Sequence, residues 1–250
     1  MTDPLETVLS QLDRWRHLPK YRLEQHVDVL FGLTLPTVIG RRFNIDSSTL
    51  DVIPEFPIHH RTAGISGKNN QSSNVDFAVF SKGGERVFLV ELKTDVNSIK
   101  NKQLDRMRKT RGKFRCLVNA VRTIAEHSPQ KQKYLHLIFE LHQVGAMHVN
   151  DELRKLDPCQ RLSGFTSALR RCLAKDTVQC TPTLVLVHPC QKELADMVKN
   201  KNLCTRHFCC IDFKQYAAKL DREEGMEAAL AQHLAEWRTP AGKVKPRWRQ

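Results

Sequence analysis

The sequence predicts an α/β protein built on a mixed central sheet. Short runs rich in valine and phenylalanine, typical of buried strands, alternate with longer segments whose apolar residues recur at helical spacing. The chain has 250 residues, of which 40% are hydrophobic and 27% charged, so it is long enough to bury a sizeable core. We expect one domain over residues 1–237, with a helical insertion at about 116–180 and a basic, flexible tail at 238–250.

The first elements are two helices followed by a strand. Apolar residues at helical spacing predict helices at about 3–17 and 20–32. The stretch from Leu50 to Ile58 alternates like a strand, but its two prolines cannot donate hydrogen bonds to a neighbouring strand. We therefore expect this strand to lie at an edge of the sheet or to end irregularly, and to be followed by a polar loop from His59 to Ser73.

The remaining elements follow a hairpin at residues 74–93, which is the clearest local signal in the chain. Strands at 74–80 and 86–93 flank the sequence Ser-Lys-Gly-Gly-Glu. Three helices are expected next: a basic helix at about 98–126, a helix that is opened by Ser128-Pro129 and ends near Gly145, and a helix at about 160–174. Two more strands follow, at 183–189 and 207–213, separated by a helical stretch at 191–199. The last helix is expected at about 221–237.

The charge of the chain is its unusual feature. Forty Lys and Arg against twenty-seven Asp and Glu give a net charge of +13, which attracts polyanions such as nucleic acid. No apolar run reaches the roughly 18 residues that a spanning helix needs, so a membrane partner is not expected. With no export signal at the first residues, the eight cysteines are interpreted as reduced thiols and the protein as cytoplasmic.

The hairpin brings acidic and basic residues together. A two-residue turn at Gly83-Gly84 makes the numbers of cross-strand partners sum to 167, so Asp76 faces Glu91. Strand alternation then puts Asp76, Glu91 and Lys93 on one face. Adjacent carboxylates repel, and a hard divalent cation resolves that conflict. The alternative is an exposed Glu-Lys pair, but the apolar residues beside both acids favour buried strand ends.

These residues resemble the signature of a nuclease superfamily. Asp76, followed after fourteen residues by Glu91-Leu92-Lys93, is similar to the D…(D/E)-x-K pattern of PD-(D/E)XK nucleases, although Val75 rather than proline precedes Asp76. The likeness covers about residues 20–110 and the strand near 185, and implies a restriction-endonuclease-like α-β-β-β-α-β core. It also implies a Mg²⁺-dependent nuclease, with Mn²⁺ as the alternative ion.

The resemblance assigns roles to individual residues. Asp76, Glu91 and the backbone carbonyl of Leu92 bind the metal, and Lys93 positions or activates the attacking water. Related enzymes often place a helical glutamate beside the metal, which here is Glu24, or else Glu24 is a helix-boundary residue. Gln103, twelve residues after Glu91, is expected near the site or a phosphate unless it is an ordinary exposed glutamine. Glu55 is expected at the surface.

A strongly basic segment follows the signature. Between Ser98 and Arg115 there are eight basic residues and one acid, a density that favours contacts with a phosphate backbone over a merely solvated face. The residues expected to bind nucleic acid are Lys100, Lys102, Arg106, Arg108, Lys109 and Arg111. DNA is favoured over RNA as the partner, and a homodimer is compatible with the sequence.

Other function classes receive less support. A catalytically inactive nucleic-acid-binding module on the same fold is the main alternative, although the intact acids and lysine argue against it. The histidines and cysteines near residues 188–210 lack a Cys-x-x-Cys pair, so a zinc site there is disfavoured. The glycine-rich loops of nucleotide hydrolases and dinucleotide-binding proteins are absent from the sequence.

Overall fold

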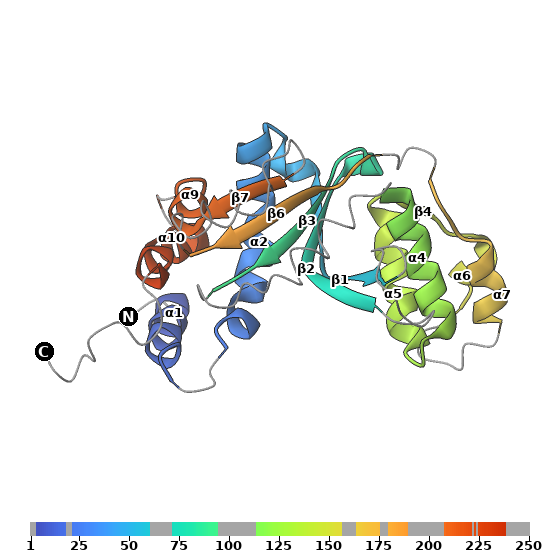
Figure 1. Cartoon of the computed structure of the whole chain (residues 1–250), viewed down its shortest axis with the longest axis horizontal. Coiled ribbons are helices and arrows are strands. Elements are labelled where there is room, and N and C mark those ends of the chain that lie inside the picture. Colours follow the sequence, from blue (N-terminus) through green and yellow to red (C-terminus); the bar gives the residue numbers. More distant parts are fainter. Residues whose placement is uncertain are drawn as a thin grey trace, which may run out of the picture. The chain divides into compact units, whose positions relative to one another are not determined.

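The computed structural model describes residues 4–18, 22–60, 72–94, 114–156, 164–175, 180–189, 208–221, 223 and 225–238. Within these ranges the protein is α/β, as predicted, with a five-stranded mixed sheet in the order β1-β2-β3-β6-β7 and a separate pair, β4-β5 (Figure 1). The chain divides into two compact units. Unit 1 comprises residues 1–48, 90–100 and 185–250, and unit 2 comprises residues 49–89 and 101–184.

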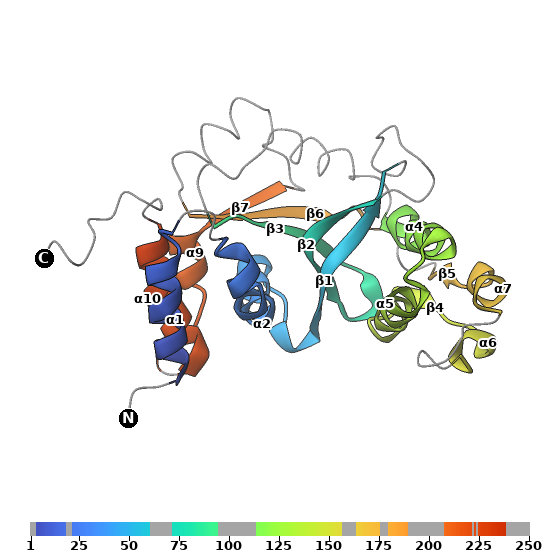
Figure 2. The ribbon, with the colours of Figure 1, turned by 90° about the horizontal axis from the view of Figure 1, so that it is seen from below.

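The helices of unit 1 come from both ends of the chain. They are α1 (Pro4–Trp15), α2 (Glu24–Phe43), α9 (Phe213–Ala217) and α10 (Gly225–Trp237). Both views show α1 alongside α10 (Figure 1 and Figure 2). The last helix starts at residue 225 rather than about 221, and the short helix α9 that precedes it was not predicted. Asp212 begins α9 with a capping box to Gln215, a pattern that the sequence analysis missed.

Helix α2 is longer than the sequence predicted. It was expected to end near residue 32, yet it continues through Pro36 to Phe43. Proline removes a helical hydrogen bond, but the turns after it bury apolar side chains that are at most 1% exposed, Leu35, Val38 and Ile39. That burial offsets the missing bond. The helix ends where Asn44 adopts a left-handed conformation, with φ of 53°.

The first two strands lie in unit 2. Strand β1 (Leu50–His59) pairs antiparallel with β2 (Ser72–Ser81), from Leu50 opposite Ser81 to His59 opposite Ser72. The short 3-10 helix η1 (Ser47–Thr49) precedes β1. Strand β1 is an outer strand of the sheet, which confirms the edge position predicted from its prolines.

The connection from β2 to β3 (Val87–Leu92) keeps the predicted register near the turn but not the predicted turn. Ser81 donates its backbone N–H to the carbonyl of Arg86 at 2.9 Å, so these two residues face one another and their numbers sum to 167. Between them lies the 3-10 turn η2 (Lys82–Gly84) instead of a two-residue loop. Both glycines of this turn have positive φ, 84° at Gly83 and 73° at Gly84, which explains why glycine stands there.

The helices of unit 2 are α4 (Phe114–His127), α5 (Lys131–Gln143), α6 (Asp151–Arg154) and α7 (Phe165–Arg170). Helix α5 begins at Lys131, not at Pro129, because the Ser128 hydroxyl accepts the N–H of Gln130 at 3.0 Å and forms a local turn. The helix expected to reach residue 174 ends at Arg170. The next residues form a small sheet, β4 (Met147–His148) with β5 (Leu173–Ala174), in which Asn119 accepts the N–H of Ala174 at 3.0 Å.

The remaining strands are β6 (Thr183–His188) and β7 (Phe208–Asp212), close to their predicted positions. Aromatic rings pack in the core of each unit. Phe80 lies 6.1 Å from Phe56 and 5.5 Å from Phe114 in unit 2, and Phe31 lies 5.0 Å from Tyr216 in unit 1, measured between ring centroids. None of the helices in the described ranges combines the length and apolar character that a membrane crossing needs.

Candidate functional site

A buried ion pair stands at the end of strand β3. The Lys93 ammonium lies 2.7 Å from Glu91 Oε1, and the residues are only 6% and 1% exposed. Lys93 Nζ also donates to the carbonyl of Leu92 at 2.9 Å. Alternation within one strand brings residues two apart to the same face, so this pair has the relation that the sequence predicted. Buried charges are costly unless they are paired and hydrogen-bonded, and here each meets its partner.

Helix α2 adds a second carboxylate to this strand end. Glu24, the first residue of α2, accepts the backbone N–H of Thr94 through Oε1 at 3.2 Å. Thr94 directly follows Lys93, whose own N–H donates to the carbonyl of Val187 at 2.9 Å and so links β3 to β6. Unit 1 therefore holds Glu24, Glu91 and Lys93 around the last residues of β3.

Asp76 lies in the middle of strand β2 and is partly exposed. The register of β1 and β2 pairs Pro54 with Phe77 and Phe56 with Val75, which leaves Glu55 level with Asp76. Glu55 has a positive φ of 50°, and its carboxylate accepts a hydrogen bond from the Asn74 amide at 2.9 Å. Glu55 is exposed, as predicted. Strand β2 neighbours β3 in the sheet, and the pairing of Asp76 with Glu91 stays a prediction.

Several residues named from the sequence lie outside the described residues. These are Gln103, the basic residues between 100 and 111, the polar loop at 61–71 and the tail from 239 onward. The contacts with nucleic acid expected of the basic residues, and the expected place of Gln103 near the site or a phosphate, remain predictions.

The donor set at the end of β3 suits a hard cation. The oxygens of Glu91 and Leu92, both assigned to metal binding by the resemblance, converge on one positive group, the Lys93 ammonium. Carboxylate and carbonyl oxygens are the ligands that Mg²⁺ prefers. The residues therefore fit a magnesium site in their chemistry, with Lys93 beside it as the positive group.

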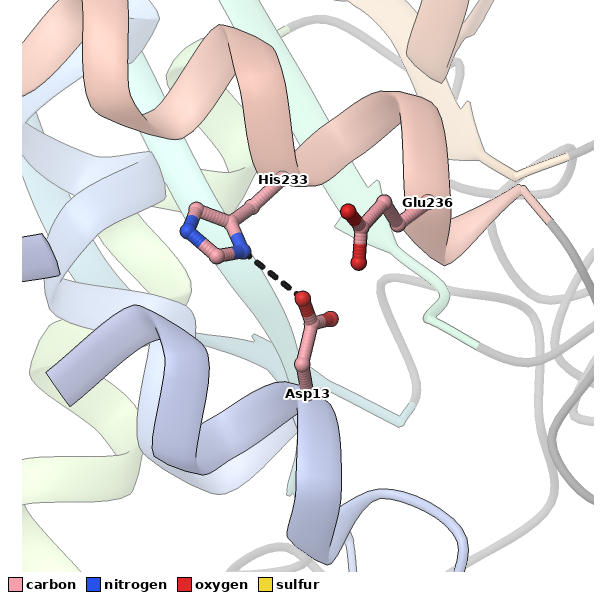
Figure 3. A group of neighbouring side chains, drawn as sticks. All are labelled: Asp13, His233 and Glu236. Carbon is pink, nitrogen blue, oxygen red and sulfur yellow. Dashed lines mark hydrogen bonds and ion pairs between the residues drawn. The ribbon is translucent and has the colours of Figure 1, made fainter. Parts of the chain in front are cut away.

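A second cluster of ionisable residues was missed by the sequence analysis. Asp13, His233 and Glu236 bring three potential ligand atoms within 4.8 Å of one another, from helices α1 and α10 (Figure 3). Asp13 Oδ2 lies 2.8 Å from His233 Nδ1, and the Trp237 indole N–H donates to Asp13 Oδ1. The only sequence signal was spacing: His233 and Glu236 lie three residues apart on one helix face.

Hydrogen bonds and charges within this second cluster shift the pKa values of Asp13 and His233. Burial alone raises the pKa of Asp13, but hydrogen bonding, with His233 foremost, outweighs burial and holds the pKa below its usual value. Burial lowers the pKa of His233, but the carboxylates of Asp13 and Glu6 outweigh it and raise that pKa. The cluster therefore attracts positive charge strongly.

Comparison of the chain with protein-family models, with curated proteins and with solved structures gave no match. The case for a function at either cluster therefore comes from the residues, their burial and their contacts, together with the resemblance of the Asp76…Glu91-Leu92-Lys93 pattern to the nuclease signature.

Proposed function

We propose that the protein is a metal-dependent nuclease that hydrolyses phosphodiester bonds in DNA, on a restriction-endonuclease-like core. The observation that carries the proposal is the buried Glu91–Lys93 ion pair at the end of β3, with the Glu24 carboxylate on the adjoining residue Thr94. Two carboxylates and an ammonium at the end of an inner strand are the groups that phosphodiester hydrolysis uses.

The energetic cost of these charges supports a functional role. A buried ion pair often contributes no more stability than apolar residues of similar size. The rest of β3, from Val87 to Val90, is apolar and at most 2% exposed, so apolar residues suit this strand. Two charged residues at its end are therefore better explained by chemistry than by packing.

Each residue has a distinct task in the proposal. Asp76, Glu91 and the Leu92 carbonyl would hold Mg²⁺, which when bound polarises the scissile phosphate and lowers the pKa of a bound water. Glu24 fixes the backbone at Thr94 and so orients the residues before it. The Lys93 ammonium, held by Glu91 and Leu92, would orient the attacking water and stabilise the negative charge that develops on the phosphate oxygens.

The charge of the chain supports nucleic acid as the substrate. A net charge of +13 favours binding to the phosphate backbone, a contact that does not depend on sequence. The basic segment after β3 is expected to supply much of this contact. Salt-sensitive binding to DNA of any sequence follows from the proposal.

The test is cleavage of DNA by the purified chain. Supercoiled plasmid, linear duplex and single-stranded DNA are incubated with Mg²⁺, with Mn²⁺ or with EDTA. We expect metal-dependent cutting that falls at least about 100-fold in Lys93→Ala, the size of loss typical when one charge-stabilising group is removed. Lys82→Ala is the matched control, because Lys82 is an exposed lysine in the turn before β3.

The outcomes separate the two functional hypotheses. Cutting at the parental rate by a folded Lys93→Ala protein, checked by circular dichroism, contradicts the site assignment. Salt-sensitive DNA binding without cutting under any of these conditions favours the catalytically inactive binding module instead.

A further inference from the structure

We propose that Asp13, His233 and Glu236 form a binding site for a divalent transition metal of the zinc class, separate from the proposed nuclease site. The site lies within unit 1, between α1 at the start of the chain and α10 near its end. It rests on its own geometry and does not depend on the nuclease proposal.

The three side chains converge from two helices. Their ligand atoms all lie within 4.8 Å of one another, and Figure 3 shows the Asp13 and Glu236 carboxylates and the His233 ring turned towards a common space. His233 and Glu236 share a face of α10 because they are three residues apart. Asp13 on α1 faces them, with Oδ2 at 2.8 Å from His233 Nδ1. A separation near 3 Å is compatible with two atoms bound to one small cation.

Hydrogen-bond partners outside the three ligands orient the His233 ring and the Asp13 carboxylate, as outer partners do in metal sites. Histidine ligands usually hold their second ring nitrogen against a carboxylate or carbonyl, which fixes the tautomer. Here His233 Nε2 lies 3.1 Å from Glu6 Oε1, which leaves Nδ1 directed towards Asp13. On Asp13, the Trp237 indole N–H engages Oδ1 and leaves Oδ2 directed towards His233.

The local charge favours a cation. Glu6, Asp13 and Glu236 bring three carboxyl groups to the site, and Arg16 Nε lies 3.7 Å from Asp13 Oδ1. Acidic groups gathered this closely repel one another when they are ionised, and a bound cation relieves that repulsion.

The donor set and its exposure define the class of metal. One imidazole nitrogen and two carboxylate oxygens suit Zn²⁺, which commonly takes three protein ligands and a water. Asp13 and His233 are 7% and 4% exposed, whereas Glu236 is exposed. Glu236 therefore lies on the solvent side, where an ion can enter and a water can complete its coordination.

The experiment is Zn²⁺ titration of the full chain by calorimetry. It is done with the parental protein in excess Mg²⁺, which occupies the proposed nuclease site. We expect one tight site that His233→Gln and Glu236→Gln remove, and that Glu6→Gln weakens about 10- to 100-fold, as loss of a second carboxylate partner does elsewhere. The control is His148→Gln, an exposed histidine of β4.

Two safeguards keep the result decisive. Glu236 is exposed, so Glu236→Gln tests the site even if His233→Gln fails to fold. Co²⁺ substitution distinguishes this nitrogen and oxygen site from binding to cysteines, because thiolate ligands add intense charge-transfer absorption. Equal Zn²⁺ affinity in the parental protein and in Glu236→Gln, or a thiolate spectrum unchanged by Glu236→Gln, overturns the proposal.

Discussion

Replacing Lys93 by methionine is expected to destabilise the protein far more than an ordinary lysine substitution. Methionine keeps much of the length of the side chain but removes the charge that lies 2.7 Å from Glu91 Oε1. Glu91 is 1% exposed, so its carboxylate would stay buried without the Lys93 charge beside it. Breaking a buried pair in this way costs about 3–5 kcal/mol of the free energy of unfolding. The lost hydrogen bond to the Leu92 carbonyl acts in the same direction.

The double substitution Lys93→Met with Glu91→Leu is expected to cost much less than the sum of the single substitutions. Removing both charges takes the buried carboxylate away together with the ammonium, and apolar replacements of buried pairs are often close to neutral. The measurement is urea unfolding in EDTA of the parent, both single variants and the double variant, as a double-mutant cycle. Lys82→Met, in the exposed turn, is the control and should change stability by less than about 0.5 kcal/mol.

The same proteins distinguish a metal ligand from a merely structural acid. If Glu91 binds Mg²⁺, the ion stabilises the Lys93→Met protein, by about 2.7 kcal/mol when its free concentration is 100 times the dissociation constant. The double variant lacks the carboxylate and should gain little. Additive costs in EDTA refute the buried-pair reasoning, and equal Mg²⁺ effects on both variants refute the assignment of Glu91 to the metal.

Two further predictions concern stability away from the candidate site. Tyr216→Phe removes the buried hydroxyl that lies 2.8 Å from Thr34 Oγ1, and should lower the free energy of unfolding by about 1 kcal/mol in thermal or urea melts. The cost stays modest because the Thr34 hydroxyl keeps its hydrogen bond to the Leu30 carbonyl at 2.9 Å, and a loss above about 3 kcal/mol contradicts this account. The hydrogen bond from Arg170 holds the pKa of Glu126 below its usual value. This pair therefore stabilises the fold at pH values above about 4.3, the pKa of Glu126 in the unfolded chain. The stabilisation is lost as the pH falls through the lowered pKa of Glu126 in the folded protein. The free energies of unfolding of the parent and of Arg170→Gln, measured by urea melts, should differ by at most about 1 kcal/mol near neutral pH and become equal at the acid end of this range. A difference in stability that persists in acid argues against the ion pair as its source.

Sequence patterns within a short window of residues predicted the strands and the edge of the sheet, but not the ends of the helices. Runs rich in valine and phenylalanine around a glycine turn identified the strands that carry Asp76 and Glu91, and the lack of a proline N–H placed β1 at the sheet edge. Helical spacing failed to find the end of α2, which continues because the apolar side chains after Pro36 are buried and hold the helix together. Burial by distant parts of the chain is not visible in a window of neighbouring residues, so helix ends were the least accurate predictions.

The candidate site was predictable only where its residues are close in sequence. Glu91 and Lys93 are two apart on one strand, and their ion pair follows from strand geometry. Glu24 was named through the resemblance, and its hydrogen bond to Thr94 spans 70 residues. The pairing of Asp13 with His233 spans 220 residues, and helical spacing within either helix gives no information about which helix it meets.

Two metal sites of different chemistry would make chelation an ambiguous test of the nuclease mechanism. EDTA would remove an oxygen-bound Mg²⁺ beside Glu91 and also a Zn²⁺ that joins α1 to α10, and Glu91, Glu24 and Lys93 belong to the same unit as the zinc site. Loss of cutting in EDTA would then have a catalytic cause or a structural one. Restoring Mg²⁺ alone to chelated protein separates them, because the oxygen site recovers while the zinc site stays empty. Glu236→Gln makes the same separation without chelator, since it disables only the zinc site and leaves the residues at the end of β3 unchanged.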